Sequence, residues 1–290
     1  GSMSGDSIHS ARNALLQMLG QLGPEDQFSL SKFGSTHQHC HARMVSMDSS
    51  QSEHALSWAR QLQADMGGTE MESALLSTRQ QRDLLLITDG EVFAIDALIQ
   101  TARHKAQRIF IVGIGASPAE QHLRRLAFAT GGSCEFVAPD EDAQPAILRM
   151  FHRLRSPVLT QLHLELPADV KLLPTLPLPR HAFADEHLQV YLRIEGAWPS
   201  QQPLQLTGHV DGATEPLLLA HCLPQTVVDN DNSLARMAAH ALIKLQPDLA
   251  SMATYQRPLS EEQLEKLALR YQLITDQTHF VLVHEHAEQD

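Results

Sequence analysis

The segment that most constrains the fold is Asp83-Leu-Leu-Leu-Ile-Thr-Asp-Gly90, an uninterrupted apolar run that ends in an acidic residue and a glycine. A short run that is apolar at consecutive positions is typical of a strand covered on both faces in a parallel sheet. Helical and strand patterns then alternate over 95–106 (helix), 108–115 (strand), 118–130 (helix), 133–138 (strand) and 143–154 (helix). This alternation predicts an α/β fold with an open, mostly parallel sheet and helices on both faces, which is a Rossmann-like arrangement.

The residues before this run predict further elements of the same domain. Apolar side chains step by three and four from Asp6 to Leu22, which indicates an amphipathic helix that Gly23-Pro24 would end. Strands are expected over 26–33 and 36–45, and helices over 53–62 and 70–80. Together with the alternating part, these elements predict a first domain over residues 1–155.

The pattern changes after Ser156-Pro157. Apolar residues now alternate with polar ones over 159–166, 187–195, 203–212 and 215–223, with proline-rich connections between them, which predicts an antiparallel β subdomain. Helices are expected over 233–245 and 260–271, and a last strand over 279–285. The helix at 260 has a capping box, with Ser260 as its N-cap and Gln263 three positions later. Residues 156–290 are therefore expected to form a second, β-rich subdomain with two helices.

Charge excludes some classes of partner. The 290-residue chain has a formal net charge of -12, which argues against nucleic acid because that partner requires a basic face. It contains no apolar stretch of membrane-spanning length, so direct membrane insertion is not expected. Cys40, Cys134 and Cys222 are far apart and form no C-x-x-C pair, so we expect buried thiols outside disulfides. The compartment stays open between cytoplasmic and extracytoplasmic.

Three short segments gather oxygen-bearing side chains at the ends of predicted sheet elements. They are Gly1–Gly5 before the first helix, 67–70 at the start of another helix, and Thr88-Asp89-Gly90 after the apolar strand. In an open α/β sheet, ligands bind beyond the carboxyl ends of the strands. Hydroxyls of Ser2 and Thr69 with the carboxylate of Asp89 are hard donors that suit Mg²⁺ or Ca²⁺. Simple capping of their own helix and turn is the alternative role of Thr69 and Asp89.

The same segments carry a family resemblance. "GSMSG", "GGT" and "LLLITDG" resemble the three metal-site loops of the von Willebrand factor type A domain, whose metal-ion-dependent adhesion site (MIDAS) is written D-x-S-x-S, then Thr, then Asp. In that comparison Ser2 matches the second serine, Thr69 the threonine and Asp89 the late aspartate. "GPEDQFSLSKF", "RSPVLTQLHLELP", "AAHALIKL" and "YQLITDQTHFVLV" are similar to the inter-alpha-trypsin inhibitor heavy chains and their intracellular relatives, over essentially the whole chain.

The resemblance implies a function and one departure from the family pattern. It implies a non-enzymatic protein-binding or adhesion module, in which Mg²⁺ (or Ca²⁺ or Mn²⁺) captures an Asp or Glu of a protein partner. The family's first strand and its Asp-x-Ser would precede Gly1, so a first domain without its first strand is expected. The metal site would then be weak or absent in this chain. A strand exchanged with a second copy, for which 279–285 is a candidate, could complete the sheet.

Other interpretations remain open beside this one. A structural scaffold with an inactive metal site would bind partners through the C-terminal β subdomain. His37, His39 and His41 would share one face of a strand, as a solvent-facing row or as a zinc site. Gly113-Ile-Gly115 imitates a dinucleotide-binding fingerprint, but Pro118 replaces its third glycine. No nucleophile with a paired acid and base can be assembled from the spacing, so no enzyme activity is expected.

Overall fold

The computed structural model describes most of the chain. The described residues are 5–41, 43–68, 70–78, 82–90, 94–115, 119–173, 178–179, 181–184, 186–199, 201–210, 213–225, 231–250, 259–275 and 278, without the side chains of 245–250. The chain divides into two compact units: unit 1 comprises 1–157 with 183–185, and unit 2 comprises 158–182 with 186–290. No helix among the described residues is both long enough and apolar enough to span a bilayer.

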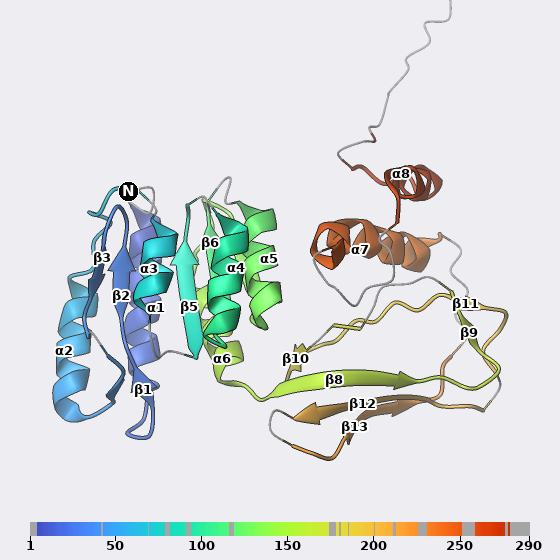
Figure 1. Cartoon of the computed structure of the whole chain (residues 1–290), viewed down its shortest axis with the longest axis horizontal. Helices are drawn as coiled ribbons and strands as arrows, with labels where there is room; N and C mark the ends of the chain where they lie inside the picture. Colours follow the sequence, from blue (N-terminus) through green and yellow to red (C-terminus); the bar gives the residue numbers. More distant parts are fainter. Residues whose placement is uncertain are drawn as a thin grey trace, which may run out of the picture. The chain divides into compact units, whose positions relative to one another are not determined.

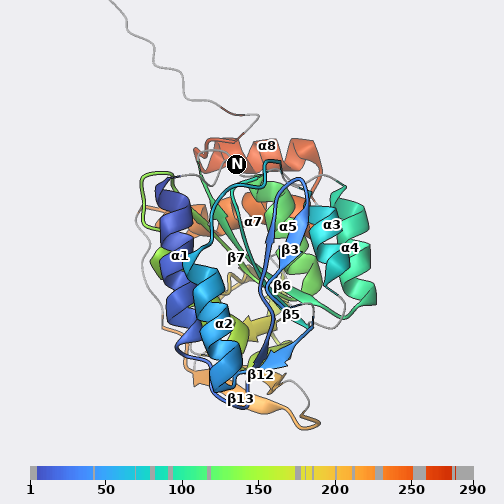
Figure 2. The ribbon, with the colours of Figure 1, turned by 90° about the vertical axis from the view of Figure 1, so that its left-hand side faces the viewer.

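Unit 1 is built on a three-stranded parallel sheet in the order β5-β6-β7 (β5 and β6 are labelled in Figure 1, and all three strands in Figure 2). Strand β5 covers Asp83–Thr88, β6 covers Arg108–Ile114 and β7 covers Cys134–Val137. Four consecutive β6 residues, Ile109 to Val112, are 0% exposed, so both faces of this strand are covered. The parallel α/β sheet expected from the consecutive apolar positions is therefore confirmed.

Helices cover both faces of this sheet (Figure 2). Helices α1 (Asp6–Leu19) and α6 (Gln144–Arg155) lie on one face, and α3 (Met71–Ser77), α4 (Ile95–His104) and α5 (Glu120–Thr130) lie on the other. Helix α1 ends at Leu19, not at Leu22 as expected. Its last turn tightens, since the amide groups of Gln21 and Leu22 bond three residues back to Met18 and Leu19. Apolar periodicity continues through such a turn and does not reveal it.

Two short antiparallel ladders, one of them a hairpin enclosed by the other, replace the two longer strands expected before residue 46. Strand β1 (Gln27–Phe28) pairs with β4 (Val45–Ser46), and β2 (Ser31–Phe33) pairs with β3 (His37–His39). Each expected strand is therefore broken in two. The range 26–33 contains β1 and β2, and the range 36–45 contains β3 and the first residue of β4. Helix α2 (Ser49–Arg60) packs against α1 beside them, and begins at an Asp48 N-cap whose carboxylate accepts from the Gln51 amide. Among the described strands, β5 pairs only with β6, and β2 only with β3.

A four-stranded sheet in the order β10-β8-β12-β13 belongs to unit 2 except for Phe183, the last residue of β10. Its strands are β8 (Val158–Glu165), β10 (His181–Phe183), β12 (Leu204–Val210) and β13 (Leu217–Cys222), and a separate antiparallel ribbon joins β9 (Lys171–Leu172) to β11 (Ile194–Glu195). Strand β12 pairs antiparallel with β8 and with β13, as expected for this region. The strand expected over 187–195 is wrong except at its last two residues. The alternation of apolar and polar residues does not produce a strand here, because residues 187–193 form no β-ladder with another segment.

Two helices follow in unit 2. Helix α7 covers Ser233–Ala250 and α8 covers Glu261–Arg270. The strand expected over 279–285 lies outside the described residues. None of the three cysteines is in a disulfide, as expected, but the expectation that they are buried is wrong. Cys40 and Cys134 are half-buried, and Cys222 is exposed because it ends β13, the edge strand of its sheet.

The capping box at the start of α8 is confirmed, and it gives a direct stability prediction. The Gln263 amide donates to Ser260 Oγ over 3.3 Å, and the Ser260 amide donates to Gln263 Oε1 over 2.9 Å. We expect Ser260→Ala to lower the free energy of unfolding of unit 2 by about 1 kcal/mol, because one helix-terminal amide loses its acceptor. Denaturant unfolding checks this value, with Ser260→Asp as the control that keeps a capping oxygen. Equal losses in the two variants would contradict the prediction.

Candidate functional site

The carboxyl ends of β5 and β6 form one part of the predicted metal site. Asp89 follows β5 directly and its side chain is half-buried. The chain turns after it, where the buried Gly90 amide donates to Thr88 Oγ1 over 3.2 Å. Gly115 follows β6 at a φ of 120°, and a Cβ placed on it would lie 4.0 Å from Asp89 Cβ. The Asp89 side chain therefore begins beside the end of the neighbouring strand, at the sheet edge where ligands bind in such folds.

The residues on either side of Thr69 are fixed against the turn between β2 and β3. The Ser35 amide donates to the Met66 carbonyl over 2.8 Å, the Gly68 amide donates to Ser35 Oγ over 3.0 Å, and the Glu70 amide donates to the Gly34 carbonyl over 2.8 Å. In Figures 1 and 2 this turn lies at the same end of unit 1 as the carboxyl ends of β5 and β6. The chain around Thr69 is therefore held at the end of unit 1 that carries Asp89.

Asp89 is the one predicted oxygen ligand that falls among the described residues. Asp89 is described, whereas Ser2 and Thr69 lie outside the described residues. The carboxylate of Asp89 suits a hard cation such as Mg²⁺ or Ca²⁺, so the described part of the site fits a divalent ion of this class. The alternative in which Thr69 caps its helix also falls on a residue outside the described ones; Glu70 is the residue directly before α3, and its side chain makes no capping hydrogen bond.

The row of histidines expected on one strand face is interrupted. His37 and His39 lie on β3 with ring centroids 5.1 Å apart, and each ring bonds a serine, Ser73 at 3.2 Å and Ser31 at 2.6 Å. His41 lies beyond the end of β3 and does not continue the row. The expected set of His37, His39 and His41 is therefore not brought together by a single strand.

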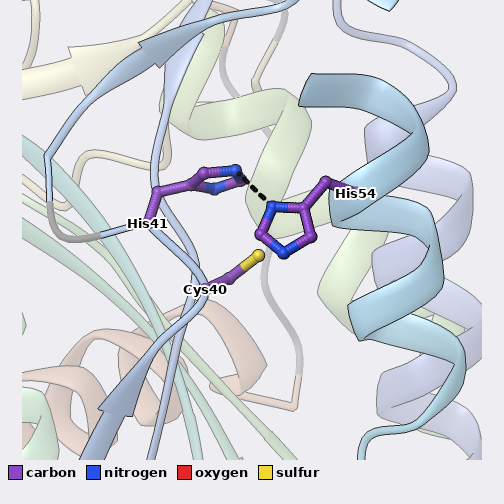
Figure 3. A group of neighbouring side chains, drawn as sticks. All are labelled: Cys40, His41 and His54. Atoms are coloured by element: carbon purple, nitrogen blue, oxygen red, sulfur yellow. Dashed lines mark hydrogen bonds between the residues drawn. The ribbon is translucent and has the colours of Figure 1, made fainter. Parts of the chain in front are cut away.

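His41 instead meets two other side chains, Cys40 and His54 (Figure 3). One ligand atom from each of the three residues can be chosen so that all lie within 4.8 Å of one another. His41 Nε2 and His54 Nδ1 are 3.2 Å apart. Sequence spacing did not connect His54 to this group, because His54 comes from α2 and reaches the others only through tertiary packing. The adjacent Cys40-His41 pair was the one visible signal.

Burial affects the protonation of this group. It raises the pKa of the Cys40 thiol above its ordinary value. Burial, and then the neighbouring His54, lower the pKa of His41, while the side chain of Gln51 acts in the opposite direction. The His41 imidazole is therefore biased toward its neutral form, in which a ring nitrogen has an available lone pair.

Packing explains one glycine of the apparent dinucleotide fingerprint. A Cβ on Gly113 would lie 2.6 Å from the Phe136 ring of β7, so the absence of a side chain lets these neighbouring strands pack closely. Glycine is thus required at this position for the core of unit 1, without any nucleotide.

Known proteins resemble this chain over nearly its whole length. A family model described as von Willebrand factor type A domain matches residues 1–136. The human von Willebrand factor A domain-containing protein 5A is 26% identical over 95% of this chain and 36% of its own length. The mouse inter alpha-trypsin inhibitor, heavy chain 4 is 24% identical over 97% of this chain and 33% of its own length. The chain thus spans about a third of the length of these relatives.

The fold comparison agrees with the sequence comparison. The solved structure of a von Willebrand factor type A protein from Catenulispora acidiphila covers 94% of this chain and 77% of its own chain, with a TM-score of 0.50 and 16% identity. Domains of this family are generally protein-interaction modules. Residues 1–136 thus match the von Willebrand factor type A domain family, and along nearly its whole length the chain is similar to relatives that include an inter-alpha-trypsin inhibitor heavy chain.

Proposed function

We propose that this chain is a non-enzymatic protein-binding module that captures a carboxylate of its partner through a divalent metal ion. The observation that carries the proposal is the position of Asp89 at the carboxyl end of β5, beside the end of β6. It is supported by the hydrogen bonds that fix Gly68 and Glu70, on either side of Thr69, at the same end of unit 1. The match of residues 1–136 to the type A domain family supports the coarser part, which is protein interaction.

The proposed ligands are Ser2, Thr69 and Asp89. A bound Mg²⁺, or Ca²⁺ or Mn²⁺, would supply a Lewis-acidic position that accepts an Asp or Glu of the partner. The hydroxyls of Ser2 and Thr69 donate lone pairs without charge, so they add no negative charge of their own. Asp89 contributes its carboxylate directly or through water. A ligand set with few anions leaves much of the cation's charge unneutralised, which favours an additional carboxylate from outside.

We also propose a division of the chain into a type A domain over 1–155 and a β-rich subdomain over 156–290. The break between units after Pro157 supports it. The second candidate function assigns partner binding to this subdomain, with an inactive metal site. Exposed leucines on β13 favour it, since Leu217 and Leu218 are 53% and 54% exposed on an edge strand.

Magnesium titration of the full chain tests the metal proposal. Bound ion stabilises the folded state by mass action, by about 2.7 kcal/mol at a hundred times the dissociation constant. We expect the midpoint of thermal unfolding to rise with Mg²⁺ concentration. Asp89→Asn and Thr69→Ala should each weaken this response at least about tenfold, because each removes a proposed oxygen ligand.

Asp65→Asn is the matched control. Asp65 is another carboxylate of unit 1, and it pairs with Lys32 over 3.0 Å on an exposed part of the surface. Its variant should keep the full magnesium response. A chain that gives no response to Mg²⁺, or whose Asp89→Asn and Asp65→Asn variants respond alike, would rule out the metal site. Partner capture that is unchanged by removal of divalent ions would instead favour the β subdomain.

A further inference from the structure

The group formed by Cys40, His41 and His54 lies on well-packed parts of unit 1. The Cys40 amide donates to the Leu30 carbonyl over 2.9 Å, which fixes the chain just beyond β3. The His41 ring packs edge-on against Phe28, with ring centroids 5.5 Å apart, and Phe28 is buried in the cluster between α1, α2 and the β1–β4 ladder. His54 lies on α2 next to the fully buried Ala55. Each of the three residues is therefore held in place by a different part of unit 1, and the packing of these parts brings the three side chains together.

The spacing within the group suits coordination of one ion. Two nitrogens bound tetrahedrally to zinc at about 2.0–2.1 Å lie about 3.3 Å apart. His41 Nε2 and His54 Nδ1 are 3.2 Å apart, and the thiol lies in the same group within 4.8 Å (Figure 3). A hydrogen bond between two imidazoles would explain the pair of rings, but it would not explain the thiol beside them. Closing the group around an ion needs a side-chain movement of about 1 Å.

Two further features suit a ligand site. His41 Nδ1 is buried and has no hydrogen-bond partner of normal geometry among the described residues, so this ring nitrogen is not committed to a protein group. His54 is exposed, which gives an ion a path from solvent to the group. A thiolate with two imidazoles is a soft and borderline donor set, which selects zinc-class ions over Mg²⁺ and Ca²⁺.

We propose that Cys40, His41 and His54 form a binding site for a zinc-class transition-metal ion. Three protein ligands leave the fourth tetrahedral position for water or for a donor from another molecule. Coordination converts the Cys40 thiol to a thiolate and releases its proton to solvent, while both imidazoles bind in their neutral form. This site does not depend on the proposed function, since it shares no residue with Ser2, Thr69 and Asp89 and differs from them in donor chemistry.

Cobalt substitution tests the proposal in the full chain, after removal of bound metal and reduction of the thiols. One equivalent of Co²⁺ is expected to give the strong visible bands of tetrahedral cobalt and a near-ultraviolet band from thiolate-to-cobalt charge transfer, and Zn²⁺ should displace both. Cys40→Ser should abolish the charge-transfer band. His54→Gln should weaken binding at least about 10- to 100-fold, because loss of a direct ligand costs no less than loss of a group that only supports a ligand. Because His54 is exposed, this variant is expected to fold.

Two matched controls make the result specific. Cys222→Ser removes the exposed thiol on β13, and His37→Ala removes an exposed imidazole on β3. Both variants should keep both cobalt bands and the affinity of the parent chain. The proposal is overturned if equimolar Co²⁺ gives no tetrahedral bands, if Cys40→Ser keeps the charge-transfer band, or if His37→Ala weakens binding as much as His54→Gln. A response to Mg²⁺ in the thermal assay neither produces nor removes these bands, so the two metal proposals can fail separately.

Discussion

Gly132→Ala is expected to destabilise unit 1 by about 3 kcal/mol or more, the upper end of what overpacking a core costs. A Cβ on Gly132 would lie 1.9 Å from the Ile109 carbonyl oxygen and 2.5 Å from its carbonyl carbon. Both atoms are backbone, so no rotamer change relieves the overlap. Ile109 is 0% exposed in the middle of the parallel sheet, and moving it disturbs its pairing with β5. Because whole domains have only about 5–15 kcal/mol of stability, this loss is severe.

Denaturant unfolding of the full chain, followed by circular dichroism, measures the effect. Gly20→Ala is the matched control. Its Cβ would meet only carbonyl oxygens of its own helix end, at 3.5 and 3.7 Å, and its φ of -69° suits any residue. We expect Gly20→Ala to change the free energy of unfolding by less than about 0.5 kcal/mol. A Gly132→Ala variant that unfolds at the same denaturant concentration as Gly20→Ala would show that α5 and β6 are not packed as described.

The parallel core of unit 1 could be predicted because its physical cause is local. A strand covered on both faces must be apolar at consecutive positions, and Leu84 to Ile87 and Ile109 to Val112 satisfy this condition within a few residues. The capping box at Ser260 is local in the same sense, since both of its hydrogen bonds span three residues. These predictions were possible because each pattern depends only on residues that are close together in the sequence.

The remaining features depend on contacts between distant segments. The expected strand breaks after Phe28 because Phe28 pairs with Val45, and residues 26–33 contain no local signal for that partner. The pattern over 187–195 meets the local condition for a strand, but only Ile194 and Glu195 find a partner, in β9.

The group of Cys40, His41 and His54 could not be predicted for the same reason, because one of its three residues comes from a helix packed alongside. In the proposed magnesium site, Asp89 could be placed from sequence because the end of a parallel strand is a local signal.

The position of the loop before α3 depends on another glycine. Gly34 is buried in the turn after β2, and a Cβ there would lie 2.5 Å from Met66 Cβ, 2.6 Å from the Met66 carbonyl oxygen and 2.7 Å from its carbonyl carbon. The same two segments are joined by the hydrogen bonds from Ser35 to Met66 and from Glu70 to Gly34. Glycine at position 34 thus allows the backbone approach that holds the loop containing Thr69.

Gly34→Ala is therefore expected to affect both stability and the proposed magnesium site. Overpacking against backbone, together with weakening of two hydrogen bonds, should lower the free energy of unfolding by about 3 kcal/mol. Displacement of the loop should weaken the thermal response to Mg²⁺ at least about tenfold, because ligand position governs ion affinity. Gly68→Ala is the control on the other side of the same contact, where a Cβ would meet only the rotatable Ser35 hydroxyl, at 3.3 Å. If Gly34→Ala lost stability but kept the parent response to Mg²⁺, the loop containing Thr69 would not take part in binding the ion.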